Sequence, residues 1–201
     1  MTIDVLLCIF AAVGGQSAPA AAAPPQVSHH WGPIFVSPMG EPFHADRGGD
    51  AMAIWFAQAD RNHDGFLTVD EMQADAERFF ATLDTNHDGE IDPDEIDHYE
   101  KVIAPQIWAA TGEPREGETH QGASRFGLLD LPEPVASADA DFNRGVSLEE
   151  FRQAAAERFA ALDLDHRGRL SLAQLEIMRP PPAATPHKSD QEPDIDTGSV
   201  P

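Results

Sequence analysis

Residues 60–71 read DRNHDGFLTVDE, and residues 84–95 read DTNHDGEIDPDE. Both segments place Asp, Asn and Asp at alternate positions, follow them with Gly and end on Glu. Residues 139–150 (DADFNRGVSLEE) and residues 163–174 (DLDHRGRLSLAQ) repeat much of this pattern, and the two members of each pair begin 24 residues apart. A pattern that recurs at a fixed spacing indicates repeated structural units, so the sequence indicates a duplicated pair.

The four segments resemble the calcium-binding loop of the EF-hand family, whose signature is D-x-[DN]-x-[DN]-G-x5-E. In that family the ligand oxygens come from positions 1, 3, 5, 7, 9 and 12, with a backbone carbonyl at position 7 and a bidentate Glu at position 12. Glycine at position 6 allows a sharp turn with positive φ. The resemblance implies an all-α fold of helix–loop–helix repeats: four loops in two duplicated pairs, with short loop–loop β pairing. We number them loops 1 to 4 in chain order.

Loops 1 and 2 fit the signature at every position. The ligands that the resemblance implies for loop 1 are Asp60, Asn62, Asp64, Phe66 (through its carbonyl), Thr68 and Glu71. Those for loop 2 are Asp84, Asn86, Asp88, Glu90 (through its carbonyl), Asp92 and Glu95. Two complete matches in register are too specific for chance, so we expect both loops to bind Ca²⁺.

Loop 3 keeps all its side-chain ligands but departs from the signature at the turn. The implied ligands are Asp139, Asp141, Asn143, Gly145 (through its carbonyl), Ser147 and Glu150. Arg144 stands where Gly belongs, which costs about 1 kcal/mol for a side chain held at positive φ, and the adjacent Gly145 could share the bend. Pro132 and Pro134 also limit the entering helix to about one turn, at residues 134–138. We expect weaker binding here.

Loop 4 loses two ligands. Arg167 replaces the position-5 oxygen, and Gln174 replaces the bidentate Glu. Both changes oppose a divalent cation, so we expect a structural loop without metal that pairs with another loop. His63, His87 and His166 all fall at position 4, which supplies no ligand in this family, and we expect them to face solvent.

The short spacing predicts continuous helices within each pair. Residues 72–83 and 151–162 are each too few for two helices and a turn, so one helix must serve both flanking loops. Helical intervals place apolar residues on one face of each: Met72, Ala76, Phe80 and Leu83, then Phe151, Ala155, Phe159 and Leu162. A helix of about fifteen residues is about 22 Å long and holds its loops apart. We therefore predict that loop 1 pairs with loop 4, and loop 2 with loop 3.

Two further helices are predicted at the outer flanks of the first pair. Residues 50–59 form the entering helix of loop 1, with Ile54, Trp55 and Phe56 as core candidates. Residues 91–108 hold an exit helix whose inner face carries Ile96, Tyr99 and Ile103, until Pro105.

The spacing also resembles that of lanmodulin-like bacterial EF-hand proteins, over residues 50–108 and 139–178. This resemblance implies a lanthanide ion as the alternative metal. Those proteins carry Pro at position 2 of their loops, where this chain has Arg61, Thr85, Ala140 and Leu164. Calcium is therefore the expected metal, and a lanthanide the alternative.

The two ends of the chain differ from the repeat region. Residues 1–20 are predicted to be a signal peptide, with an apolar run at 5–13 and small residues after it, although no Lys or Arg precedes the run. Export would place the protein in the periplasm or outside the cell; an uncleaved apolar N-terminus is the alternative. We divide the rest into a linker and unassigned segment (21–48), loop pair 1 (49–108), a linker or insertion (109–133), loop pair 2 (134–179) and a disordered tail (180–201).

Composition narrows the class of partner. Lys and Arg total 13 against 35 Asp and Glu, so the formal net charge is −22. Such a chain repels nucleic acid and anionic membranes and attracts cations. The sequence holds none of the usual hydrolase, zinc-protease, P-loop or dinucleotide motifs, and we predict that it is not an enzyme.

The leading functional hypothesis is a calcium buffer or sensor that binds two to three Ca²⁺ ions. One alternative keeps the fold and changes the metal to a lanthanide. Another is a calcium-gated adaptor or regulatory subunit of an envelope enzyme, which would contact an unidentified protein through residues 26–48 and 109–134.

Overall fold

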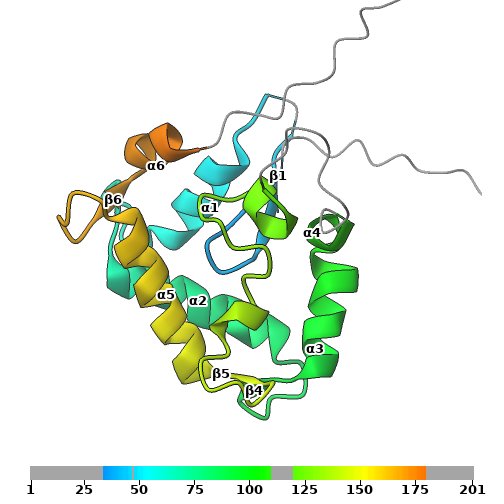
Figure 1. The fold of residues 1–201 in the computed structure, drawn as a ribbon. Coiled ribbons are helices and arrows are strands. Elements are labelled where there is room, and N and C mark those ends of the chain that lie inside the picture. Colours follow the sequence, from blue (N-terminus) through cyan, green and yellow to red (C-terminus); the bar gives the residue numbers. More distant parts are fainter. Residues whose placement is uncertain (1–33, 47, 110–119, 180–201) are drawn as a thin grey trace, which may run out of the picture. The chain divides into compact units, whose positions relative to one another are not determined.

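The computed structural model describes residues 34–46, 48–109 and 120–179, which all lie in one compact unit of the chain. The predicted signal peptide and tail lie outside these residues. The strands are β1 (Ile34–Val36), β2 (Pro42–His44), β3 (Phe66–Leu67), β4 (Glu90–Ile91), β5 (Val146–Ser147) and β6 (Leu170–Ser171). The α-helices are α1 (Ala51–Ala59), α2 (Val69–Leu83), α3 (Pro93–His98), α4 (Pro105–Ala109), α5 (Leu148–Leu162) and α6 (Leu172–Met178) (Figure 1).

The two long helices, α2 and α5, pack against each other and carry the centre of the core. Each starts at a capping box, in which the hydroxyl of Thr68 or Ser147 accepts the N–H of the Glu three residues later. Each ends at the first Asp of the next loop. The predicted continuous helices are thus confirmed, and all eight residues of the two predicted apolar faces are buried. The rings of Phe80 and Phe151 lie 5.8 Å apart across the contact.

Short antiparallel ladders join the four loops two by two. Strand β3 of loop 1 pairs with β6 of loop 4, with Leu67 opposite Leu170. Strand β4 of loop 2 pairs with β5 of loop 3, with Ile91 opposite Val146. These four side chains have no exposed surface. Each loop is therefore paired with a loop from the other half of the chain, as the length of α2 and α5 requires.

An N-terminal β-hairpin completes the core. Strands β1 and β2 pair with Phe35 opposite Phe43, and residues 37–41 form the turn between them, which we call the hairpin tip. Phe35, Val36, Met39 and Phe43 are buried, and the Phe35 ring lies 5.4 Å from that of Trp55 in α1. No secondary structure is predicted from the sequence for this part of residues 21–48. Its strands have three residues each, too few for a visible alternation of apolar and polar side chains.

The described part of the 109–133 segment also packs into the fold. A 3₁₀ turn spans Gly122–Arg125, with Ala123 buried. The Val36 N–H donates to the carbonyl of Phe126 at 3.1 Å, and the Ala123 N–H donates to that of Pro132 at 2.9 Å. Residues 120–133 are therefore an ordered layer beside the hairpin and not a free linker.

Two helix predictions need correction. Residues 91–108 do not form one regular helix: α3 passes at Tyr99 into a π-helix (Tyr99–Ile103), in which the Ala104 N–H donates to the Tyr99 carbonyl just before Pro105. In α1, Trp55 and Phe56 are buried as expected, but Ile54 is 46% exposed and lies on the outer face. Across the described residues, no helix has the length and apolar character needed to cross a membrane.

Candidate metal centre

In loops 1 and 2, the first aspartate is held by backbone donors of its own loop. The carboxylate of Asp60 accepts the N–H of Asp64 at 3.2 Å and that of Gly65 at 2.9 Å. The carboxylate of Asp84 accepts the corresponding N–H groups of loop 2 at 3.2 and 3.1 Å. The turn that makes these contacts needs positive φ at position 6, which is 84° at Gly65 and 89° at Gly89.

The position-12 glutamates turn back over their loops. Glu71 accepts the N–H of Asn62 at 3.3 Å with one oxygen and that of Thr68 at 3.0 Å with the other. Glu95 in loop 2 and Glu150 in loop 3 divide their two oxygens between the start and the end of the loop in the same way. In all three loops the glutamate therefore accepts hydrogen bonds from both ends of its loop. Among the described residues, three acidic side chains come within 4.8 Å of one another in loop 3 and not in loops 1 and 2.

Hydrogen bonds keep two of these glutamates charged. Burial raises the pKa of Glu95, but hydrogen bonds from Thr85 and from the backbone of Asp92 and Asn86 outweigh it, so the pKa lies below its ordinary value. The pKa of Glu150 is lowered first by the backbone N–H of Ser147 and then by its hydroxyl. Both groups are carboxylates at neutral pH, which is the form that binds a hard cation.

Loop 3 reaches the same backbone shape by a different route. Arg144 itself adopts φ 84°, and its N–H donates to Asp139 at 3.0 Å, as the position-6 glycines do in loops 1 and 2. The expectation that Gly145 shares the bend is wrong, since its φ is not positive. Gly145 instead leaves room for a neighbour, because a Cβ there would lie 1.7 Å from Oε1 of Glu90 in loop 2.

The carboxylates of loop 3 converge on a point that suits a cation. Oxygens of Asp139, Asp141 and Glu150 all lie within 4.8 Å of one another. Oδ1 of Asp139 is buried and accepts no hydrogen bond from the described residues. A buried acceptor without a donor is costly, and a cation at this point would remove the cost. The residues present therefore fit an oxygen-ligated ion such as Ca²⁺.

In loop 4, side chains of the loop itself donate to an oxygen at a predicted ligand position. Oε1 of Gln174 accepts from Ser171 as a position-12 Glu would, but Nε2 of the same amide donates to Asp165 at 3.1 Å. Nε of Arg167 lies 3.0 Å from that same Asp165 oxygen. Position 3 carries a predicted ligand in the other loops (Asn62, Asn86 and Asp141), whereas the Asp165 carboxylate at this position of loop 4 is paired with protein donors.

Position 4 faces solvent in all four loops. His63, His87 and His166 are exposed, with φ between 52° and 60°, and Phe142 in loop 3 has the same conformation with 86% of its surface exposed. The histidines lie on the outside of the loops, as expected.

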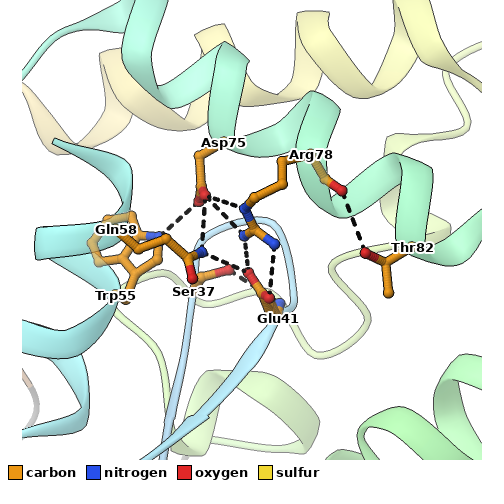
Figure 2. Close-up of polar contacts among 7 residues, drawn as sticks. All are labelled: Ser37, Glu41, Trp55, Gln58, Asp75, Arg78 and Thr82. Atoms are coloured by element: carbon orange, nitrogen blue, oxygen red, sulfur yellow. Dashed lines mark hydrogen bonds and ion pairs between the residues drawn. The ribbon is translucent and has the colours of Figure 1, made fainter. Parts of the chain in front are cut away.

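An ionic cluster around the buried carboxylate of Asp75, not predicted from the sequence, fastens the hairpin tip to α2 (Figure 2). Asp75 accepts from Nε1 of Trp55 at 3.1 Å and from Arg78, and Arg78 also contacts Glu41 of the tip. Asp75 is buried and falls between Met72 and Phe79 on the inner face of α2. Arg158 similarly falls on the inner face of α5. Both residues could have been found in the sequence, because each is a charged residue at a position where the helical pattern expects an apolar one.

Comparison with known proteins supports part of this assignment. The EF hand family model matches residues 52–74 and 76–97, which contain loops 1 and 2 with their flanking helices. This supports an EF-hand domain of the calcium-binding family in that part of the chain. Loops 3 and 4 lie outside the matched residues. No curated protein matches the chain significantly.

Proposed function

We propose that this chain is a calcium-binding protein that holds Ca²⁺ in loops 1, 2 and 3 and uses loop 4 as a metal-free structural partner. The observation that carries the proposal is the common arrangement of Glu71, Glu95 and Glu150, each of which bridges the start and end of its loop. An ion bound there would be held by these carboxylates together with the oxygens at positions 1, 3, 5, 7 and 9. The same oxygen set suits a lanthanide, which remains the alternative metal.

A buffer fits the structure better than a sensor. A sensor exposes an apolar surface when calcium binds. Here the hairpin already covers the apolar faces of the repeat region with Phe35, Met39 and Phe43. Its tip is also tied down by polar contacts: the Tyr99 hydroxyl donates to the Gly40 carbonyl at 2.7 Å, and Arg78 contacts Glu41. Opening such a surface would break these contacts along with the apolar packing.

The adaptor alternative rests on one observation. A surface cavity of about 430 Å³ lies between β2, α2 and the π-helix, lined by Pro42, Phe79, Ile103 and neighbouring residues. Val102, which also lines it, is 62% exposed. A pull-down from envelope extract with and without calcium tests this alternative, and a partner retained only with calcium would favour it over a buffer. We further propose that the protein is exported, because residues 1–20 resemble a signal peptide. We also propose that it is not an enzyme, because its sequence holds none of the usual catalytic motifs.

The direct test is a calorimetric titration of the full chain with Ca²⁺ and separately with La³⁺. Three equivalents of bound Ca²⁺ are expected, falling to two in the Glu95→Gln variant, because that change removes a charged bidentate ligand. Gln174→Ala is the matched control in loop 4 and is expected to leave three equivalents. Tight La³⁺ binding with negligible Ca²⁺ binding would favour the lanthanide alternative, and binding of neither ion would refute the proposal.

A further inference from the structure

Loop 3 lacks the helical support that holds the other three loops. The first aspartates of loops 1, 2 and 4 close the last turns of α1, α2 and α5: the N–H groups of Asp60, Asp84 and Asp163 donate to carbonyls four residues earlier, at 2.8, 2.8 and 2.9 Å. Asp139 instead donates to Ala136 at 3.3 Å, at the end of a 3₁₀ turn of three residues, Ala136–Ala138. Just before this turn, the Ser137 N–H donates to the Glu133 carbonyl at 3.0 Å, and Pro132 and Pro134 keep this single turn from extending further back as a helix.

A buried arginine from α5 makes the missing contacts. Arg158 is 6% exposed. Its Nη2 donates to the Pro134 carbonyl at 2.7 Å and to Oγ of Ser137 at 3.0 Å. Ser137 in turn donates to the same Pro134 carbonyl at 3.1 Å. The guanidinium therefore holds the segment immediately before loop 3, residues 134–138, which we call the lead-in.

The other arm of Arg158 reaches the hairpin tip. Its Nη1 donates to the Pro38 carbonyl at 2.9 Å and contacts Sδ of Met39 at 3.3 Å. No ion pair joins Arg158 to a carboxylate among the described residues. Burial lowers its pKa to about 10, so it is still a cation at neutral pH. A buried cation is costly unless its donors are satisfied, and here the tip accepts from Nη1 and the lead-in accepts from Nη2.

We propose that Arg158 is a positioning residue for loop 3: its guanidinium replaces the absent entering helix and couples the loop to the hairpin tip. The proposal rests on the proposed function in that loop 3 takes up Ca²⁺. A cation binding at Asp139 needs a fixed lead-in. The lead-in is held by its own backbone hydrogen bonds, by the burial of Val135 and Ala138 and by Arg158, and Arg158 is the contact that links it to the tip. Because such coupling is reciprocal, calcium in loop 3 stabilises the contact between Arg158 and the hairpin tip.

The test compares Arg158→Met with Arg152→Met in the full chain. Both changes remove an arginine from α5, but Arg152 forms a surface ion pair with Glu77 and makes no contact with the lead-in in the structure. Calcium titration is followed by NMR at the backbone amides of Gly65, Gly89 and Arg144, each of which donates to the first aspartate of its own loop. Amide hydrogen exchange at residues 136–139 is measured without metal as a second readout.

We expect Arg158→Met to weaken calcium binding in loop 3 by about tenfold or more, since charged hydrogen bonds to the lead-in are lost, with loops 1 and 2 changed less than about twofold. Exchange at residues 136–139 should accelerate, and Arg152→Met should do neither. Equal weakening of all three loops, or unchanged exchange in the lead-in, would overturn the proposal. If the wild-type loop 3 takes no calcium, its assigned function fails, whereas the exchange readout still decides the role of Arg158.

A milder variant protects the test against misfolding. Ser137→Ala removes one of the two lead-in contacts and leaves the buried guanidinium in place. It should weaken loop 3 by about twofold to fivefold, which is less than the loss of the whole guanidinium, because the bond from Arg158 to the Pro134 carbonyl remains. No effect of Ser137→Ala on loop 3, in a protein whose loops 1 and 2 bind normally, would also count against the proposal.

Discussion

Loops 3 and 4 both depart from the calcium-loop signature, and they depart in opposite ways. Loop 3 loses the glycine and keeps every ligand oxygen; Arg144 adopts the strained φ itself, and Oδ1 of Asp139 is left without a donor. Loop 4 keeps Gly168 and loses the position-12 acid, and the Gln174 amide closes onto Asp165. The backbone turn is thus preserved in both loops, so it does not distinguish the proposed metal site from the proposed structural loop. The two loops differ in their ligand oxygens at positions 5 and 12.

Glu150→Gln should make loop 3 resemble loop 4, and we expect this to have the largest effect. The change removes a charged ligand and supplies an amide donor that can bond to Asp141, as Gln174 does to Asp165. Calcium affinity of loop 3 should fall on the order of a hundredfold, while loops 1 and 2 keep theirs. Site-resolved NMR titration checks this, with Glu149→Gln on the exposed neighbouring position as the control. Undiminished binding in loop 3 would show that the donor set is not decisive.

The converse change should create a site in loop 4. Arg167→Asp combined with Gln174→Glu restores oxygens at positions 5 and 12 on a backbone that is already bent, with Gly168 at φ 70°. Calorimetry should record one calcium equivalent more than in the wild type. Gln174→Glu alone, which leaves the Arg167 cation beside Asp165, should give a much weaker gain. If the double variant gains no site, then loop 4 differs from the others in more than its ligands.

Arg144→Gly should measure the cost of the strained turn in loop 3. Glycine adopts φ 84° freely, so the metal-free protein should be more stable by about 1 kcal/mol. Denaturant unfolding tests this, with Phe142→Gly at the exposed position 4, φ 61°, as a second site of the same kind. A loss of stability would mean that the Arg144 side chain makes a favourable contact that outweighs its strain.

We expect the smallest effect, a pH-dependent change in melting temperature, from Glu133 in the segment that enters loop 3. Glu133, just before the lead-in of loop 3, has its pKa raised by burial and then by the charge of Glu100. An acid with a raised folded pKa binds its proton more tightly in the folded state, so its contribution falls as pH rises from about 4.5. Glu133→Gln should therefore raise the melting temperature slightly at pH 7 and have no such effect below pH 4. A constant difference across this range would exclude titration as its cause.

The sequence predicted those parts of the molecule that repeat. Two twelve-residue gaps were enough to predict α2 and α5 as continuous helices, and the signature located the carboxylates of loop 3 despite Arg144. The hairpin was missed because its strands are too short to show a period. Arg158 was missed because its partner Pro38 is 120 residues away in the chain. A contact between two unlike segments produces no periodic pattern in the sequence. A charged residue among the apolar positions on the inner face of a helix, such as Arg158, can still be recognised.

Pairing of the first loop with the last also constrains the order in which the protein is assembled. Strand β3 ends at residue 67, whereas its partner β6 begins at residue 170. Closing so large a stretch of chain has a high entropic cost, and such distant contacts form slowly. As the chain is synthesised, loop 1 emerges early and has no partner strand until about a hundred further residues have followed. Loop 2 waits less, for residues 146 and 147, so the inner pair of loops is set to form first and the outer pair to close the fold.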